Sequence, residues 1–195
     1  MVTARYNSLK ERVVIITGGG QGIGRGYAHY FSQQGAIPVL AEINGENGDK
    51  VKREIEELGG KALSFETDVS SNSPVMEMVN KTLKNMGKID ILINNAAFFS
   101  QITMAPFWNL PLEEGDRAMK VNITGSFYCA RAVVPVMQDA SWGRIVNVTS
   151  GTVALGSANY LHYITSKSAI IGMTRSMARE LDPWNITVNT FGPGL

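Results

Sequence analysis

Residues 12–24 read RVVIITGGGQGIG, an apolar run that ends in a cluster of glycines. The apolar part, Arg12–Thr17, is short and continuous, which is typical of a strand. The glycines that follow lack Cβ atoms, so the backbone there can turn tightly and let a bound group approach closely. A helical stretch continues to about Gln34, and the N–H groups and dipole of a helix N-terminus favour an anion. This order of strand, glycine-rich turn and helix predicts a pyrophosphate-binding loop.

The rest of the chain repeats the alternation of short apolar runs and longer amphipathic stretches. Strands are expected at residues 12–17, 37–41, 61–66, 89–94, 144–149 and 186–191, and helices at about residues 22–34, 45–58, 72–86, 112–139 and 158–181. Ser73 is expected to cap the third helix, with Pro74 in its first turn. The alternation predicts right-handed βαβ units in a doubly wound parallel sheet, a three-layer α/β/α fold. No repeat or linker interrupts it, so residues 1–195 are expected to form a single domain.

Composition limits the partners. The 195 residues include 18 basic and 17 acidic side chains, for a net charge of +1, so neither nucleic acid nor an anionic membrane is expected to bind. No apolar run approaches ~18 residues, and the N-terminus lacks the apolar core of a secretory signal, which together predict a cytoplasmic protein. Cys129, the single cysteine, is expected to be a packed helix residue in a reducing compartment. Two histidines and one cysteine offer no metal-ligand spacing, so no metal site is expected.

Two nucleotide-binding patterns compete for the glycine cluster. Residues 19–26 almost fit the P-loop of nucleoside triphosphatases, but Arg25 stands in place of the lysine and Gly26 in place of the hydroxyl that would hold magnesium. The pattern T-G-x-x-x-G-x-G does fit, and it resembles the cofactor loop of the short-chain dehydrogenase/reductase family, whose fold is a doubly wound (Rossmann) sheet. The resemblance assigns the cofactor contacts of this loop to Gly18, Gln21, Gly22, Ile23 and Gly24.

Glu42 closes the second expected strand, at about the place where a dinucleotide fold puts its ribose-reading acid. A carboxylate there accepts hydrogen bonds from the adenosine ribose and repels the 2′-phosphate of NADP. No lysine or arginine of the glycine loop before Gly24 offsets that charge. NAD is therefore expected rather than NADP, and an exposed glutamate at a strand end is the alternative.

Two further segments match the family after its third and fourth strands. By the resemblance, Asp68 and Val69 contact the adenine, and Asn95 contacts the cofactor while Asn94 braces the sheet. The family usually has glycine where this chain has Ala97, which slightly narrows the backbone freedom beside the cofactor.

Tyr163 and Lys167 lie four residues apart, a spacing that puts both on one face of a helix. A free tyrosine has a pKa near ~10 and is a poor base at neutral pH. A neighbouring cation favours the phenolate, so Lys167 is expected to lower the pKa of Tyr163. This spacing occurs by chance in many helices, and its weight comes from Ser150, which lies 13 residues before Tyr163, and from Asn122 in the long helix. Both match residues of the family.

The resemblance implies an oxidoreductase that transfers a hydride between NAD and a carbonyl or alcohol carbon. Tyr163 would then exchange a proton with the substrate oxygen, and Lys167 would lower its pKa and bind the nicotinamide ribose. Ser150 would steady the substrate oxygen, and Asn122 would hold a water that links Lys167 to solvent. His162, adjacent to Tyr163, points in another direction and is expected to be structural.

The substrate side is expected to be apolar. Ligands of this fold lie at the carboxyl ends of the strands, and the segments there carry an apolar set without a basic residue: Phe98, Phe99, Val153, Leu155 and Tyr160. A hydrophobic secondary alcohol or its ketone is therefore expected. The resemblance extends to NAD-dependent secondary and aryl alcohol dehydrogenases, and to 3-oxoacyl carrier-protein reductases, which commonly prefer NADP. A non-catalytic NAD-binding module is the rival from another class.

The chain ends at residues 191–195, FGPGL. In the family a Pro-Gly pair here, Pro193 in this chain, begins the nicotinamide contact, and another helix and a final strand follow. The fold is therefore expected to lack the family's last helix and strand, as a shortened version of a longer protein. By the resemblance, the helices at 112–139 and 158–181 pair across a subunit interface, which predicts a homotetramer or homodimer. The three tryptophans are expected to be packing residues: Trp108, Trp142 and Trp184.

Overall fold

The structure is a computed structural model that describes residues 6–194; residues 1–5 and 195, and with them both ends of the predicted domain, lie outside the described part. A parallel sheet of six strands has the order β3-β2-β1-β4-β5-β6. Its strands are β1 Val13–Thr17, β2 Ile37–Glu42, β3 Leu63–Glu66, β4 Ile91–Asn94, β5 Gly143–Val148 and β6 Ile186–Phe191. The predicted doubly wound parallel sheet is confirmed, because each strand lies within two residues of its expected range.

The strands β1, β2 and β4 are almost wholly buried because helices cover both faces of the sheet there, whereas the edge strands β3 and β6 are partly exposed. The helices are α1 Gly22–Gln33, α2 Gly45–Glu57, α3 Asn72–Met86, α4 Leu112–Ala118, α5 Ser126–Asp139, α6 Thr152–Leu155 and α7 Leu161–Leu181. Ile15 packs with residues of α3 and α5 in one core cluster, and Ile16 packs with residues of α1 and α2 in the other. Cys129 is buried in the first cluster, where burial raises the pKa of its thiol to about 12, as expected for a packed residue.

The chain departs from the expected helices at three places. The long helix predicted at 112–139 is divided by a π-helical segment, η3 Met119–Gly125, between α4 and α5. The helix predicted from residue 158 begins at Leu161, because Gly156 and Asn159 adopt left-handed backbone conformations with φ of 59° and 67°. The prediction that Ser73 caps α3 is wrong: Ser71 is the N-cap residue, and its side chain makes no capping hydrogen bond.

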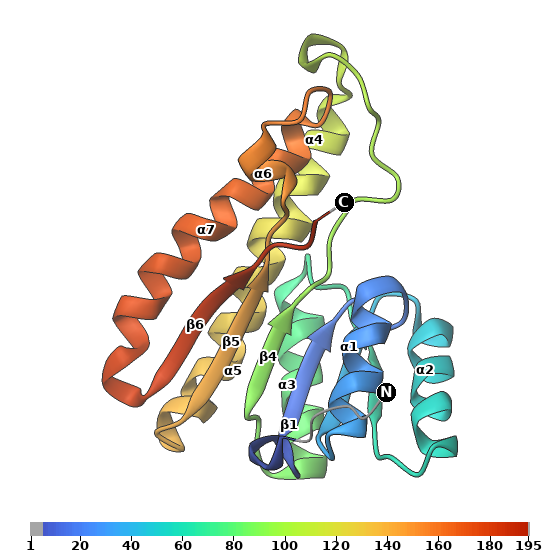
Figure 1. Cartoon of the computed structure of the whole chain (residues 1–195), viewed down its shortest axis with the longest axis vertical. Helices are drawn as coiled ribbons and strands as arrows, with labels where there is room; N and C mark the ends of the chain where they lie inside the picture. Colours follow the sequence, from blue (N-terminus) through green and yellow to red (C-terminus); the bar gives the residue numbers. More distant parts are fainter. Residues whose placement is uncertain (1–5, 195) are drawn as a thin grey trace.

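Figure 1 shows α4, α6 and the start of α7 projecting beyond the carboxyl ends of β1 and β4. The long segment between β4 and α4, drawn in green, runs up to the same end of the molecule. Trp108 in this segment is 72% exposed, so its predicted packing role is wrong. Within residues 6–194, no helix is both long and apolar enough to cross a bilayer.

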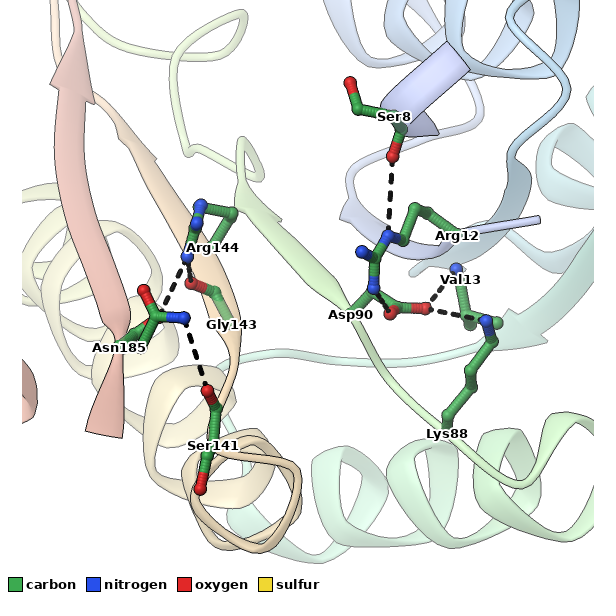
Figure 2. Close-up of polar contacts among 9 residues, drawn as sticks. All are labelled: Ser8, Arg12, Val13, Lys88, Asp90, Ser141, Gly143, Arg144 and Asn185. Carbon is green, nitrogen blue, oxygen red and sulfur yellow. Dashed lines mark hydrogen bonds and ion pairs between the residues drawn. The ribbon is translucent and has the colours of Figure 1, made fainter. Parts of the chain in front are cut away.

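The amino end of the sheet is held together by Asp90, as Figure 2 shows. Its carboxylate accepts hydrogen bonds from Arg12 Nη1 at 2.5 Å and from the Val13 N–H at 2.8 Å, and Lys88 Nζ lies 3.5 Å away. The Arg12 guanidinium also stacks 3.9 Å from the ring centroid of Trp142, which precedes β5. These contacts join β1, β4 and β5 at the end of the sheet opposite the projecting helices.

We expect Asp90→Ala to lower the free energy of unfolding by about 2–4 kcal/mol, because the buried Val13 N–H and the Arg12 guanidinium both lose their acceptor. Urea denaturation measures this. Glu77→Ala, which removes an exposed ion pair with Lys81, is the control and should stay within about 0.5 kcal/mol of the unaltered protein. Equal losses in the two variants would contradict a special role for Asp90.

Candidate active site

A cavity of about 400 Å³ opens at the carboxyl ends of the strands. All predicted site residues except Gly22 and Asn122 line it: Gly18, Gln21, Ile23, Gly24, Glu42, Asp68, Val69, Asn95, Ser150, Tyr163, Lys167 and Pro193. These residues come from the carboxyl ends of all six strands and from α1 and α7. The fold therefore brings together side chains that are up to 175 residues apart, from Gly18 to Pro193.

The glycine loop between β1 and α1 is packed too tightly for side chains. Gly18 has a φ of +64°, and a Cβ on it would lie 3.0 Å from the Ala96 Cα; a Cβ on Gly24 would overlap the Gly18 carbonyl oxygen. Asn95 Nδ2 donates to the carbonyl oxygens of Thr17 and Gly18 at 2.9 and 3.2 Å. Thr17 Oγ1 in turn accepts from the N–H groups of Asn95 and Ala96, both at 2.9 Å. The loop is thus braced against the end of β4.

This bracing assigns Asn95 and Thr17 a task that the sequence did not reveal. Asn95 was expected to contact the cofactor, and it does line the cavity, but its amide nitrogen is already bonded to the loop backbone. Asn94 braces the sheet as expected, since its Nδ2 donates to Asn147 Oδ1 at 2.9 Å and to the Ser126 carbonyl at 3.1 Å. The threonine of the T-G pattern was the signal that could have identified Thr17.

Glu42 is a buried carboxylate that faces the cavity. It is 4% exposed, which rules out the alternative of an exposed strand-end glutamate. Its Oε2 accepts from the Gly20 N–H at 2.9 Å and its Oε1 from the Asn44 N–H at 3.2 Å. These bonds fix the orientation of the carboxylate beside the glycine loop.

Lys167 and Tyr163 lie one helical turn apart on α7, and both are buried. Lys167 Nζ donates to the Val148 carbonyl at 2.8 Å and lies 5.9 Å from the centroid of the Tyr163 ring. Burial lowers the pKa of Lys167 to about 8. Burial raises the pKa of Tyr163, and a hydrogen bond with Ser150 opposes that rise. In the protein alone desolvation of the phenol prevails, and the expectation that Lys167 lowers the pKa of Tyr163 stays a prediction.

The Ser150 hydroxyl oxygen accepts two hydrogen bonds from Thr152. Its Oγ accepts from the Thr152 N–H at 3.3 Å and from Thr152 Oγ1 at 2.9 Å. A serine hydroxyl has one proton to donate and two lone pairs. The remaining proton of Ser150 is therefore free to be donated into the cavity, toward Tyr163 or toward a bound oxygen.

Asn122 lies outside the cavity lining, in the π-helical segment η3, and is fully buried. Its Oδ1 accepts from the Phe98 N–H at 2.7 Å, and its Nδ2 donates to Ser166 Oγ at 2.9 Å. The side chain thus connects the segment after β4 to α7 next to Lys167. Both of its polar atoms bond to the protein, which makes it a brace; the predicted water contact stays a prediction.

Phe99 and Tyr160 are the members of the predicted apolar wall that line the cavity. The ring of Phe99 packs against that of Tyr163, with centroids 4.7 Å apart. Phe99 is 41% exposed, whereas Tyr163 is 8% exposed. The phenyl ring therefore covers part of the phenol on the open side of the site.

The other three predicted wall residues lie elsewhere. Phe98 is buried, with the Arg117 guanidinium 4.6 Å from its ring centroid. Val153 and Leu155 belong to the short helix α6, whose turn takes them out of the cavity lining, and Leu155 is 75% exposed. The sequence could not distinguish these three residues from Phe99. The segments after β4 and β5 are neither regular strands nor long helices, so the spacing of residues there does not predict which side chains face the cavity.

No group of three or more histidine, cysteine, aspartate or glutamate side chains within residues 6–194 is arranged to hold a metal ion. His162 is buried and does not line the cavity, although Tyr163 next to it does.

Comparison with known proteins gives consistent matches. The sequence model of the family described as short chain dehydrogenase matches residues 12–195. The 3-oxoacyl-[acyl-carrier-protein] reductase FabG of Thermotoga maritima is 35% identical over 186 residues, which cover 95% of this chain and 74% of that protein. The 7alpha-hydroxysteroid dehydrogenase of Escherichia coli is 33% identical over 186 residues, 95% of this chain and 71% of that protein. The crystal structure of an NAD+-bound xylitol dehydrogenase superposes with a TM-score of 0.91 at 35% identity, over 95% of this chain and 71% of that one.

We expect Gly24→Ala to lower the free energy of unfolding by about 1–3 kcal/mol, because the new methyl group would displace the Gly18 carbonyl. Gly26→Ala on the same helix is the matched control: it faces open space and should stabilise the protein by up to about 1 kcal/mol through its helix propensity. Thermal and urea denaturation of both variants check this. A Gly24→Ala protein as stable as Gly26→Ala would contradict the tight packing of the loop.

Proposed function

The chain belongs to the short-chain dehydrogenase family, and on that premise we propose that it transfers a hydride between NAD and a hydrophobic secondary alcohol or its ketone. One observation carries the proposal. The glycine loop, the Glu42 carboxylate and the hydroxyl and amine groups of Ser150, Tyr163 and Lys167 line the same cavity. A nucleotide-binding loop and an acid–base group that share one cavity suit a reaction in which a hydride and a proton move at neighbouring atoms.

The cavity fits a dinucleotide on the evidence of its own backbone. Within the loop, Gly22 has a positive φ and open space where a Cβ would lie, and the loop leads into the N-terminus of α1, whose N–H groups attract phosphate. Glu42, fixed by its two backbone bonds, would bind the adenosine ribose and repel a 2′-phosphate, which favours NAD over NADP. The NAD+ in the similar xylitol dehydrogenase structure supports the same choice. When bound, NAD supplies the hydride chemistry.

Side chains of the protein would transfer the proton to the substrate oxygen and stabilise the charges that result. With its pKa raised by burial, Tyr163 is a phenol at neutral pH and would donate its proton to a ketone oxygen. The free proton of Ser150 would stabilise negative charge on that oxygen. Lys167, when protonated, would favour the phenolate that remains, and its donation to Val148 fixes its position.

Two alternatives differ in class or substrate. A 3-oxoacyl carrier-protein reductase is favoured by the 35% identity to FabG, whereas the buried Glu42 opposes the NADP that such reductases commonly prefer. A non-catalytic NAD-binding module would need neither the Ser150 proton nor the buried amine. A screen of secondary alcohols, ketones and 3-oxoacyl thioesters with NAD(H) and NADP(H), followed by nicotinamide absorbance, separates the three.

We also infer a homotetramer or homodimer in the cytoplasm. Phe127 on α5 and Leu161 on α7 are 44% and 52% exposed, on the two helices expected to pair between subunits. Covering such apolar side chains favours association.

We expect Tyr163→Phe to lower kcat/KM for alcohol oxidation by at least about 100-fold, because the variant keeps the ring but loses the group that exchanges the proton. Tyr160→Phe is the matched control, since Tyr160 lines the same cavity but has isoleucine at the position one turn later. Its kcat/KM should stay within about threefold of that of the unaltered protein, as for loss of an ordinary hydroxyl. Undiminished turnover by Tyr163→Phe would refute the proposed acid–base role.

The two directions of the reaction should depend on pH in opposite ways. Because burial raises the pKa of Tyr163, its proton is present at neutral pH and is lost only at high pH. Ketone reduction uses the phenol, so kcat/KM should be flat from about pH 6 to about pH 10, the ordinary pKa of tyrosine, and fall only above that. Alcohol oxidation uses the phenolate and should rise with pH over the same range. Steady-state rates in both directions measure this, and oxidation that falls with rising pH would contradict it.

A further inference from the structure

His162 is a buried polar side chain without a hydrogen-bond partner. It is 5% exposed, and among residues 6–194 neither Nδ1 nor Nε2 finds a partner within hydrogen-bond distance. Its Nε2 lies 3.6 Å from Glu114 Oε2. Burying a polar group without a partner costs free energy. The burial of the His162 ring directly before Tyr163 therefore suggests that His162 has a role beyond filling space.

Glu114, on α4, is held by the segment that crosses from β4. Its Oε2 accepts from the Thr103 N–H and its Oε1 from Thr103 Oγ1, both at 2.7 Å. These bonds lower the pKa of Glu114, and His162 contributes in the same direction. The carboxylate therefore faces two elements at once, the crossing segment through Thr103 and helix α7 through His162.

The same two elements supply the aromatic contact of the cavity. Phe99 lies four residues before Thr103, and a turn closed by the Ile102 N–H and the Phe99 carbonyl at 3.2 Å lies between them. Tyr163 is adjacent to His162 on α7. Asn122 fixes the root of the crossing segment by accepting the Phe98 N–H, and Glu114 fixes its far side, so Phe99 lies between two anchors.

We propose that Glu114 and His162 are positioning residues that hold Phe99 against Tyr163 and thereby set the width of the substrate side of the cavity. The inference rests on the proposed function and narrows its substrate class. Because Phe99 packs against the Tyr163 ring, with centroids 4.7 Å apart, and covers part of it, we infer that the carbinol carbon that reaches the phenol must carry one small substituent. Secondary alcohols with a methyl group beside the carbinol carbon fit, and those with two larger alkyl groups are excluded.

Hydrogen exchange of the Thr103 amide tests the positioning pair without any turnover. Glu114→Ala should speed this exchange at least about tenfold, and His162→Asn at least about threefold, because local opening sets the rate. Glu114→Gln keeps one acceptor oxygen and should restore most of the protection. Glu113→Ala, at the exposed neighbouring position, is the control and should change nothing, and amides of α7 report whether each variant is folded. Unchanged exchange in folded Glu114→Ala and His162→Asn would overturn the proposal.

A comparison of substrates of different size tests whether Phe99 limits the width of the cavity. For the protein with Phe99→Ala, the ratio of kcat/KM for 4-heptanol to that for 2-propanol should rise at least about tenfold, as a few methylene groups gain room. Glu114→Ala should raise it at least about threefold and Glu114→Gln by less than about twofold. An unchanged ratio in an active Glu114→Ala protein would overturn the inference. If no alcohol is oxidised by the unaltered protein, the proposed function fails, and the hydrogen exchange still decides whether Glu114 and His162 hold the segment.

Discussion

The Lys167 ammonium donates to the Val148 carbonyl at the end of β5, and this contact determines where helix α7 meets the sheet. An amine buried to 3% exposure needs an acceptor. Two further bonds reinforce the junction: Thr149 Oγ1 donates to the Lys167 carbonyl, and Asn147 Nδ2 donates to Thr174 Oγ1, both at 2.8 Å. Because α7 is fixed in this way, Tyr163, one turn before Lys167, faces the end of the sheet where the glycine loop lies.

Burial changes the pKa values of Tyr163 and Lys167 in directions that their proximity alone does not predict. Desolvation disfavours the charged form of each group, so the pKa of Tyr163 rises while that of Lys167 falls to about 8. In the protein alone the phenol therefore keeps its proton at neutral pH, and Lys167, with a pKa of about 8, is still mostly an ammonium there. The hydrogen bond with Ser150, whose lone pairs are engaged by Thr152, opposes this rise in the pKa of Tyr163.

The sequence predicted those features that depend on local composition. The central strands β1 and β4 were found because both faces of the sheet are covered there, which leaves continuous apolar runs, and the glycine loop because a Cβ on Gly24 cannot fit beside Gly18. The π-helical segment around Asn122 was not found: it packs closely against distant residues, since a Cβ on Gly125 would lie 2.9 Å from Val69 Cγ2, and local composition does not report such tertiary contacts. The split between Phe98 and Phe99 was missed for the same reason, because the backbone bond to Asn122 decides which ring faces the cavity.

The two ends of the sheet therefore perform different tasks, and the same type of interaction serves both. At the amino end, Asp90 satisfies backbone and guanidinium donors from neighbouring elements and closes the sheet. At the carboxyl end, Asn95, Glu42 and Asn122 use their side chains to hold backbone rather than one another. Backbone groups held in this way cannot rearrange cheaply, since each would be left buried without a partner. The geometry of the cavity is thus set before any ligand binds, which is the condition under which positioned groups contribute most to catalysis.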